Sequence, residues 1–312
     1  MKVLITGIAG FMGSRFAQWL LENKPGVEIL GVDNLLCGYI ENVHPDCRFA
    51  NCTIGTGRLP YCGLDFRGVD YVFHFAAYAA EGFSPFIRRK NYMHNLLPTA
   101  EVINFCVERK VKRLVYTSSM AVYGVNHPPF HEDMPRNPID PYGIAKTASE
   151  MDIEVAGKQH GMDWCIIRPH NLYGPGQSLW QKYRNVLGLW IGQILQGLPV
   201  TIFGDGEQIR AFSFLEDCLP CLWEAAVRPE ASREIINLGG KSPTTISEAQ
   251  KLLSSIREVS HLSPQVVYLE PRHEVKYAWC TTQKSIDLLG YEERTGLFHG
   301  LLEFWEKPWL IR

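Results

Sequence analysis

A tyrosine and a lysine four residues apart, Tyr142 and Lys146, have the spacing that acid–base chemistry requires. Positions i and i+4 share one face of a helix, so the phenol and the ammonium group would point the same way. A cation within a few ångströms favours the phenolate and lowers the tyrosine pKa from about 10 toward neutrality, which makes a general base. The alternative interpretation is a solvated helix face, because such pairs also arise by chance.

Two serines, Ser118 and Ser119, directly follow the apolar segment 113–117, which reads as a buried strand. A hydroxyl group at the end of a strand can bond to the substrate oxygen that loses its proton to the tyrosine. Serine, tyrosine and lysine together suit the oxidation of an alcohol by hydride transfer. The chain must then also provide a site for a hydride acceptor.

The first 33 residues have the order strand, glycine loop, helix, strand and acid, which is typical of a dinucleotide-binding unit. Apolar patterns predict a strand over 3–6, a helix over 11–21 and a strand over 27–32. The loop residues that would approach the cofactor are Gly7, Gly10, Phe11, Met12 and Gly13. Glycine lets the backbone come close to a pyrophosphate, and the free N–H groups at the start of the helix face the phosphates.

Asp33 lies 20 residues beyond Gly13, where its carboxylate can accept hydrogen bonds from both hydroxyl groups of a ribose. The same carboxylate would repel a 2′-phosphate, and Asn34 rather than an arginine follows it. These residues therefore predict NAD as the cofactor in preference to NADP. The competing interpretation, an ordinary β-to-α turn, does not explain why strand, helix and acid all agree.

The composition excludes several classes of protein. With 46% hydrophobic and 21% charged residues, the chain is ordinary for a globular protein, and its net charge of −2 gives no electrostatic case for nucleic acid or an anionic membrane. No apolar run approaches the roughly 20 residues of a membrane span, and no signal peptide fits before the first strand. Nine cysteines at irregular spacing predict a reducing, cytoplasmic location.

Cys218 and Cys221 stand at the start of a helix predicted over 219–227. We expect them to be buried small residues, and we expect no metal site.

Strands alternate with helices through the first 170 residues. Further strands are predicted at 48–50, 70–73, 113–117 and 164–168, and helices at 84–110 and 141–159. This alternation predicts an α/β fold with a doubly wound parallel Rossmann sheet that binds ligands at the carboxyl ends of its strands. Residues 1–170 are then the NAD-binding domain. Residues 171–312, with a helix predicted over 186–195, are a smaller mixed α/β substrate-binding portion, and some of its segments return to the sheet.

The motifs resemble those of the extended short-chain dehydrogenase/reductase family, and of its nucleotide-sugar epimerases in particular. The matching segments are 7–13, 74–77, 95–99, 118–124, 141–146, 168–176, 203–210 and 236–239, together with Asp33. The resemblance thus covers essentially the whole chain.

The resemblance implies a role for each matching residue. Ser119 is then the catalytic hydroxyl, Tyr142 the base and Lys146 the lysine that binds the cofactor ribose. Substrate contacts are implied at Asn171, Arg210 and Arg272, where a guanidinium fork suits diphosphate oxygens. Further cofactor contacts are implied at Phe75, Ala76, Ala77, Asn95 and Ser118.

The related enzymes begin by oxidising the C4 hydroxyl of the sugar, and additional groups decide the later steps. Dehydratases of this family carry an Asp–Glu pair just after the catalytic hydroxyl, where this chain has Met120 and Ala121. The resemblance therefore implies 4-epimerisation of a UDP-sugar. Two departures are Cys52, where the family usually has an adenine-binding aspartate, and Pro98, which replaces a glycine and is expected to bend its helix.

Glu81 leaves an alternative open. A carboxylate in this small-residue loop could line the sugar site, or it could be a solvated acid or a partner of Arg88 or Arg89. If it carried protons, dehydration or epimerisation at C5 or C3 would become plausible. An alternative of another class is a non-catalytic NAD-binding sensor or scaffold, which would typically lack Tyr142 or Lys146.

The family also implies a homodimer in which two helices of each subunit form a four-helix bundle. Apolar positions in excess of one core stripe support it on the helices around 95–108 and 142–159: Val102, Phe105, Ile144, Met151 and Val155.

Related 4-epimerases have a gatekeeper residue beside the C2 substituent of the sugar. Alignment puts Ala278 there, with Tyr277 pointing away, which predicts room for an N-acetyl group.

Overall fold

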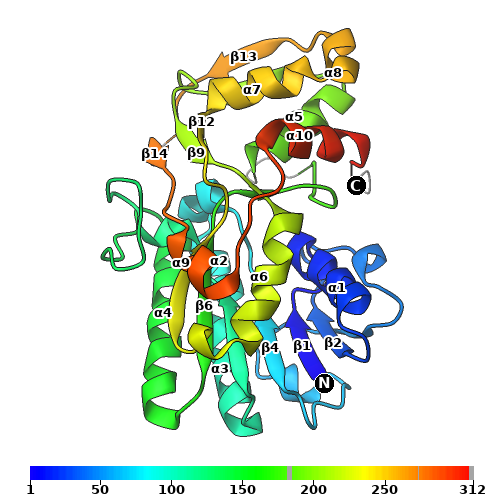
Figure 1. Cartoon of the computed structure of the whole chain (residues 1–312), viewed down its shortest axis with the longest axis vertical. Helices are drawn as coiled ribbons and strands as arrows, with labels where there is room; N and C mark the ends of the chain where they lie inside the picture. Colours follow the sequence, from blue (N-terminus) through cyan, green and yellow to red (C-terminus); the bar gives the residue numbers. More distant parts are fainter. Residues whose placement is uncertain (181–184, 273, 309–312) are drawn as a thin grey trace.

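The computed structural model describes residues 1–180, 185–272 and 274–308. Its larger part is a sheet of seven parallel strands, seen in the lower half of Figure 1. The strands are β1 (Lys2–Thr6), β2 (Glu28–Asp33), β3 (Arg48–Asn51), β4 (Tyr71–His74), β5 (Arg113–Thr117), β6 (Trp164–Pro169) and β11 (Glu234–Leu238). Their order in the sheet is β11-β6-β5-β4-β1-β2-β3. From β1 the chain adds β2 and β3 on one side, and it then crosses over to add β4, β5, β6 and β11 on the other side, so the order of the strands reverses between β1 and β4. Ligands of such sheets bind in the crevice at that reversal.

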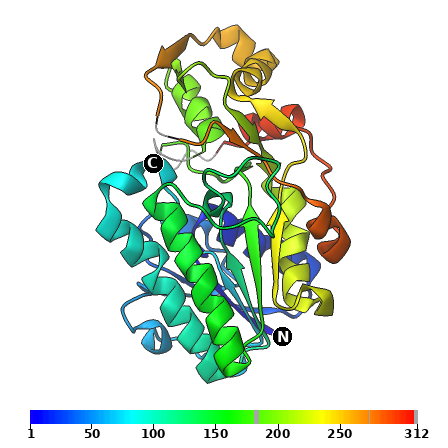
Figure 2. The ribbon, with the colours of Figure 1, turned by 90° about the vertical axis from the view of Figure 1, so that its left-hand side faces the viewer.

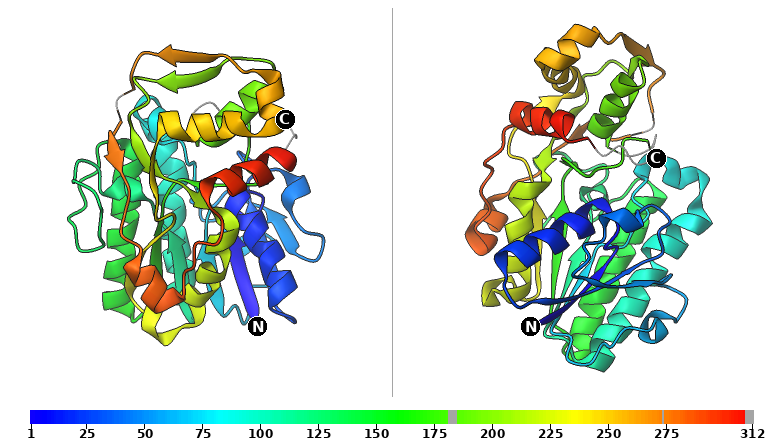
Figure 3. Two further views of the ribbon diagram at one scale, coloured as in Figure 1. Left: turned by 45° about the horizontal axis from the view of Figure 1, so that its top comes forward. Right: turned by 90° about the vertical axis from the view of Figure 1, so that its right-hand side faces the viewer.

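Helices cover both faces of this sheet, as the doubly wound prediction requires (Figures 2 and 3). One face carries α1 (Phe11–Asn23), α6 (Leu215–Val227) and α9 (Gln283–Leu289), and the other carries α2 (Arg88–Asn95), α3 (Leu97–Arg109) and α4 (Pro141–His160). The alternation of side chains along β1 assigns residues to the two faces. Val3 and Ile5 join the core under α1 and α6, whereas Leu4 joins the core under α3 and α4.

A smaller portion sits over the carboxyl ends of the large sheet (Figure 1). Its helices are α5 (Val186–Leu195), α7 (Ile246–Ser255), α8 (Arg257–Leu262) and α10 (Leu297–Glu306). Its strands are β7 (Leu172–Tyr173), β8 (Val200–Phe203), β9 (Ile209–Ala211), β10 (Ser213–Phe214), β12 (Pro243–Thr245), β13 (Val266–Leu269) and β14 (Tyr277–Ala278). Trp190, Leu253 and Phe304 belong to its own core. Between these elements the chain returns to the large sheet as α6 and β11.

Short 3₁₀ helices complete the connections. They are η1 (Ile40–Asn42), η2 (Leu59–Tyr61), η3 (Glu81–Phe86), η4 (Met120–Val122) and η5 (Pro229–Ala231). The helix predicted over 84–110 is divided into η3, α2 and α3. Pro98 lies in the first turn of α3. Proline is tolerated there because N–H groups in the first turn make no hydrogen bond within the helix, so the lack of one in proline costs nothing. The predicted bend at this proline is therefore a break between two helices.

Two sequence predictions need correction. The helix predicted from 219 begins four residues earlier, at Leu215, so Cys218 and Cys221 lie within α6. Both thiols are buried in the core, as predicted. Val102 and Phe105 are also core residues, 0% and 1% exposed, because α3 uses that side to cover the sheet. They do not belong to a partner-facing surface.

A buried ion pair fixes α4 to the sheet. The Arg168 guanidinium on β6 donates to both carboxylate oxygens of Glu150 on α4, at 2.9 and 2.6 Å, and to the Tyr123 hydroxyl at 2.8 Å. Arg136 donates to the same carboxylate at 2.6 Å. Burial disfavours the charge on Glu150, but the hydrogen bonds from Arg168 prevail and lower the pKa of this carboxyl group. The pair therefore sets the position of the helix that bears Tyr142.

Candidate active site

A cleft of about 940 Å³ lies between the carboxyl ends of the large sheet and the smaller portion. Among the described residues, every predicted site residue except Asn95 lines this cleft. Segments far apart in the sequence meet there: the glycine loop after β1, the ends of β4 and β5, the start of α4, and β9 with β14.

The glycine loop has the close packing that a dinucleotide-binding turn requires. Gly7 has φ +74°, and a Cβ there would come within 2.7 Å of the Ala76 nitrogen. A Cβ at Gly13 would come within 2.2 Å of the Gly7 carbonyl oxygen, so α1 can approach β1 only with glycine at this position. The start of α1 thereby opens into the cleft beside Phe11 and Met12, which fits the pyrophosphate of NAD.

Asp33 lies at the end of β2, beside the glycine loop. One carboxylate oxygen accepts from the Ala9 N–H at 3.1 Å, and the other accepts from the Leu35 N–H at 2.8 Å. Burial raises the pKa of this carboxyl group, while these backbone donors oppose the shift. The carboxylate lines the cleft, as does the neighbouring Asn34, at the place where a ribose would lie. Cys52 lines the same end of the cleft.

Lys146 is only 3% exposed and crosses from α4 to the end of β5. Its Nζ donates to the Thr117 carbonyl at 2.6 Å, and it lies 4.8 Å from the ring centre of Tyr116 and 5.8 Å from that of Tyr142. Burial lowers the pKa of Lys146 to about 7, and the negative charge of Glu150 opposes this shift. The phenol and the ammonium group are therefore neighbours on the cleft face of α4.

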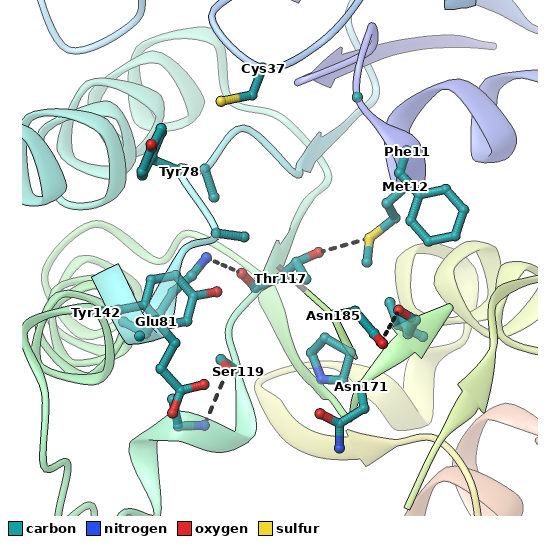
Figure 4. Close-up of a pocket in the computed structure, with 18 of the residues that line it drawn as sticks. Phe11, Met12, Cys37, Tyr78, Glu81, Thr117, Ser119, Tyr142, Asn171 and Asn185 are labelled. Atoms are coloured by element: carbon teal, nitrogen blue, oxygen red, sulfur yellow. Dashed lines mark hydrogen bonds between the residues drawn. The ribbon is translucent and has the colours of Figure 1, made fainter. Parts of the chain in front are cut away.

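Ser119 and Tyr142 lie on the same side of the cleft (Figure 4). The Ser119 hydroxyl oxygen accepts from the Ala121 N–H at 3.1 Å, which fixes its position and leaves its hydrogen available to a ligand. Tyr142 is the second residue of α4 and is 8% exposed. Met120 and Ala121, which follow Ser119, also line the cleft and cannot transfer protons.

The smaller portion contributes the side chains implied for substrate binding. Asn171 has φ +33°, a conformation that asparagine tolerates, and its amide donates to the Ala211 carbonyl at 3.0 Å. The Arg210 guanidinium donates to the Glu274 carboxylate at 3.0 Å and to the carbonyl of Val275 at 2.7 Å. Arg272 lies 3.5 Å from the ring centre of Phe203. Both arginines face the cleft opposite the large sheet.

The segment of the implied gatekeeper is extended, as β14 beside β9. Ala278 is 2% exposed and lines the cleft. Tyr277 is 45% exposed and points away from the cleft, because successive side chains alternate along a strand.

Asn95 is placed differently from the implied cofactor contact. It is buried behind the cleft wall, where its amide accepts from the Tyr78 N–H at 2.9 Å and donates to Asn91 at 2.7 Å. These bonds hold the loop that follows β4. Asn95 therefore shapes the cleft from behind instead of lining it.

Several cleft residues were not singled out from the sequence. Asp140 accepts from the N–H groups of Tyr142 and Gly143 at 2.8 and 2.9 Å and so caps α4. An aspartate directly before a proline at a helix start was a signal that could have found it. Asn185 caps α5 in the same way and has the same signal, an asparagine directly before a predicted helix. Others are Tyr78, Gln177 and Glu274, for which the sequence holds no comparable local signal.

Glu81 opens η3 and lines the cleft, with its carboxyl group on the side of Ser119 and Tyr142 (Figure 4). Its side chain is accessible from the cleft but has protein packed closely around it. The protein packed around this carboxyl group and the neighbouring charge of Asp140 raise the pKa of Glu81 above its ordinary value, although the side chain is exposed to the cleft.

Within the described part of the chain, no three His, Cys, Asp or Glu side chains form a group that could hold a metal ion. No described helix is both long and apolar enough to cross a membrane. All nine cysteines are free thiols.

Comparisons with known proteins show which proteins this chain is similar to. A family model described as the NAD dependent epimerase/dehydratase family matches residues 3–239. A putative UDP-glucose 4-epimerase of Methanocaldococcus jannaschii is 30% identical, over 96% of this chain and 95% of its own. The crystal structure of the UDP-glucose 4-epimerase of Thermotoga maritima with UDP-glucose superposes with a TM-score of 0.91, at 30% identity over 98% of both chains. That of the UDP-glucuronic acid 4-epimerase of Bacillus cereus, with UDP-glucuronic acid and NAD, has a TM-score of 0.88 at 27% identity over 98% of both chains.

The chain therefore belongs to the NAD dependent epimerase/dehydratase family. Its cofactor is NAD, and the glycine loop and Asp33 fit that dinucleotide.

The position of Asp33 generates a first prediction. We expect Asp33→Asn to weaken NAD binding by about tenfold or more, because a hydrogen bond to a charged group is lost. The preference for NAD over NADP should also narrow, because the charge that repels a 2′-phosphate is gone. Calorimetric titration with both cofactors measures the two effects. Asp65→Asn, at an exposed carboxylate paired with Arg67, is the control and should change neither. Unchanged affinities in Asp33→Asn would contradict the assignment.

Proposed function

We propose that the protein is a UDP-sugar 4-epimerase that works in the cytoplasm. The observation that supports it best is the meeting of Ser119, Tyr142 and Lys146 in an NAD-binding cleft where Met120 and Ala121 replace the acids of a dehydratase. The two solved relatives described above are named as 4-epimerases of UDP-glucose and UDP-glucuronic acid. Nine free thiols support the cytoplasmic location, which cell fractionation can test.

In this proposal the Tyr142 phenolate takes the proton from the C4 hydroxyl of the sugar, and the Ser119 hydroxyl bonds to the same oxygen. NAD, when bound, supplies the chemistry that removes and returns the C4 hydrogen. Lys146 holds the ribose of the cofactor and favours the phenolate through its charge. Tyr142 returns the proton after the 4-keto sugar has turned over in the cleft.

The diphosphate of the substrate is proposed to bind Arg210 and Arg272, with Asn171 beside it. The Arg210 guanidinium is bonded to Glu274 before substrate arrives. The bond to Glu274 keeps the Arg210 guanidinium oriented toward the cleft, and phosphate oxygens of the substrate would take the place of this carboxylate. A non-catalytic sensor is not favoured, because both Tyr142 and Lys146 are present and face the cleft.

The direct test is to incubate the purified protein with UDP-, GDP- and dTDP-sugars and to identify the products by NMR. We expect interconversion of a UDP-hexose and its C4 epimer.

Tyr142→Phe should reduce turnover by about 10²- to 10⁴-fold, since it removes the general base, while NAD binding is retained. Lys146→Ala should lower both turnover and NAD affinity. Tyr61→Phe, at a tyrosine that is 85% exposed, is the control. Near-normal turnover in Tyr142→Phe would refute the assigned base.

The width of the sugar site gives a further prediction. With Ala278 at the cleft wall, a methyl group stands where a phenol would fill the space, so an N-acetyl group at C2 should fit. We expect comparable kcat/KM for UDP-N-acetylglucosamine and UDP-glucose, and a selective loss of the acetylated sugar in Ala278→Tyr. The idea fails if the parent rejects the acetylated sugar or if the variant keeps the same ratio.

We also propose a homodimer that pairs through α4. Ile144, Met151 and Val155 lie along one side of this helix and are 42%, 54% and 44% exposed, an apolar stripe that a second subunit could cover. Light scattering at micromolar concentration should give twice the mass of the 35.5 kDa chain. The double variant Met151→Glu, Val155→Glu should be monomeric, whereas Leu262→Glu, at an exposed leucine on α8, should remain dimeric. A monomeric parent would count against the proposal.

A further inference from the structure

One carboxylate holds the loop that follows β3. Glu101 lies on α3, and its Oε2 accepts from the N–H groups of Gly55, Thr56 and Gly57, the last two at 2.9 and 3.1 Å. Its Oε1 accepts from the Leu59 N–H at 2.7 Å. Four backbone donors of one short loop therefore end on a single side chain. The path of this loop depends on Glu101.

The loop is seated on the start of α3 and in the core. Gly55 has φ +91°, and a Cβ there would come within 3.0 Å of the Pro98 nitrogen, so glycine is needed for this approach. Cys52, Ile54 and Leu59 are 7%, 6% and 0% exposed and belong to the core between the sheet and α3. Three of these residues, Cys52, Ile54 and Pro98, also line the cleft.

The order of the strands places this loop relative to NAD. β1, β2 and β3 are neighbours in the sheet. The glycine loop that fits the pyrophosphate follows β1, and Asp33, which fits the ribose, ends β2. Directly after β3, the Cys52 N–H donates to the Asp33 carbonyl at 2.8 Å. Because pyrophosphate, ribose and adenine are joined in this order, the adenine of NAD would lie beyond Asp33, beside Cys52 and Ile54.

The side chains of this loop offer little to the polar edge of adenine. The 6-amino group of the base is a hydrogen-bond donor and requires an acceptor. Ile54 and Pro98 are apolar, and the thiol of Cys52 is only a weak hydrogen-bonding group. The N–H groups that the loop donates to Glu101 are not available to the ring nitrogens. Contact with the faces of the ring is what these residues can supply.

We propose that Cys52, Ile54 and Pro98 form an adenine pocket that recognises the shape of the base and not its 6-amino group, and that Glu101 positions this pocket. Glu101 touches neither the cofactor nor the sugar in this arrangement. It acts on NAD affinity through the backbone of the loop that carries Ile54. The inference concerns the cofactor and does not depend on which sugar the protein converts.

The first test compares two dinucleotides by calorimetric titration of the protein freed of NAD. They are NAD and nicotinamide hypoxanthine dinucleotide, in which a carbonyl group replaces the 6-amino group. The parent should bind both within about threefold, whereas loss of a hydrogen bond to the amino group would separate them by about tenfold or more. Cys52→Asp, which puts an acceptor beside the base, should create a preference for NAD of about tenfold. Cys52→Ala is its control and should keep the ratio of the parent.

The second test examines the positioning residue. Glu101→Gln replaces one accepting oxygen by an amide nitrogen, so bonds to the loop are lost. NAD affinity should fall about tenfold, and the affinity for ADP-ribose, which keeps the adenosine half, should fall by the same factor. Hydrogen exchange at the amides of 55–59 should be faster in this variant without cofactor. Glu108→Gln, at an exposed carboxylate on the same helix, is the control and should change none of these.

Each part of the inference has an outcome that overturns it. A preference of the parent for NAD by about tenfold or more would overturn recognition by shape. Unchanged NAD affinity in Glu101→Gln, or a loss for NAD that ADP-ribose does not share, would overturn the positioning role. If Glu101→Gln does not fold, Glu101→Asp, whose carboxylate is one methylene group shorter, replaces it with the same expected losses. No sugar enters these measurements, so the proposed function is tested separately.

Discussion

The site depends on an ammonium group that has been taken out of water. Lys146 is 3% exposed, and its Nζ is held by the Thr117 carbonyl at 2.6 Å over the faces of two tyrosine rings. Burial of this charge is unfavourable and lowers the pKa of Lys146 to about 7. The same burial gives the charge a strong effect on its neighbours, because the surroundings screen it poorly. The phenol of Tyr142, one helical turn away, is the neighbour whose ionised form this charge favours.

A second buried charge keeps that geometry in place. Glu150 lies one turn beyond Lys146 on α4 and is bonded to Arg168 on β6 and to Arg136. Removing one partner of such a pair typically costs about 3–5 kcal/mol, because the other charge stays buried without compensation. The helix is thus fixed to the sheet at its middle by Glu150 and capped at its start by Asp140. Between these two points, Tyr142 and Lys146 have little freedom to leave the cleft.

Much of the fold was predictable from local pattern. The strand over 113–117 and the helix over 186–195 were expected from apolar periodicity at the bounds that the structure has. The glycine loop and Asp33 were predictable because each residue has a local physical reason for its type. Errors arose where burial decides the outcome. Val102 and Phe105 looked like surplus apolar positions, yet they cover the sheet, and the break at Leu96 divides one predicted helix into two.

The sequence by itself determined the cofactor class, the Rossmann sheet and the facing of Tyr142 and Lys146. The cofactor class follows from the motif in the first 33 residues, the sheet from the alternation of strand and helix patterns, and the facing from a spacing of four residues on one helix. Tertiary structure alone decided which distant side chains share the cleft. Asn95 was expected at the cofactor but is turned inward by its bonds to Tyr78 and Asn91. The Tyr142 N–H donates to the Ser84 hydroxyl at 3.2 Å, a bond between residues 58 positions apart that forms where η3 packs against the start of α4. No local pattern encodes such contacts, because they depend on how separate elements pack against one another.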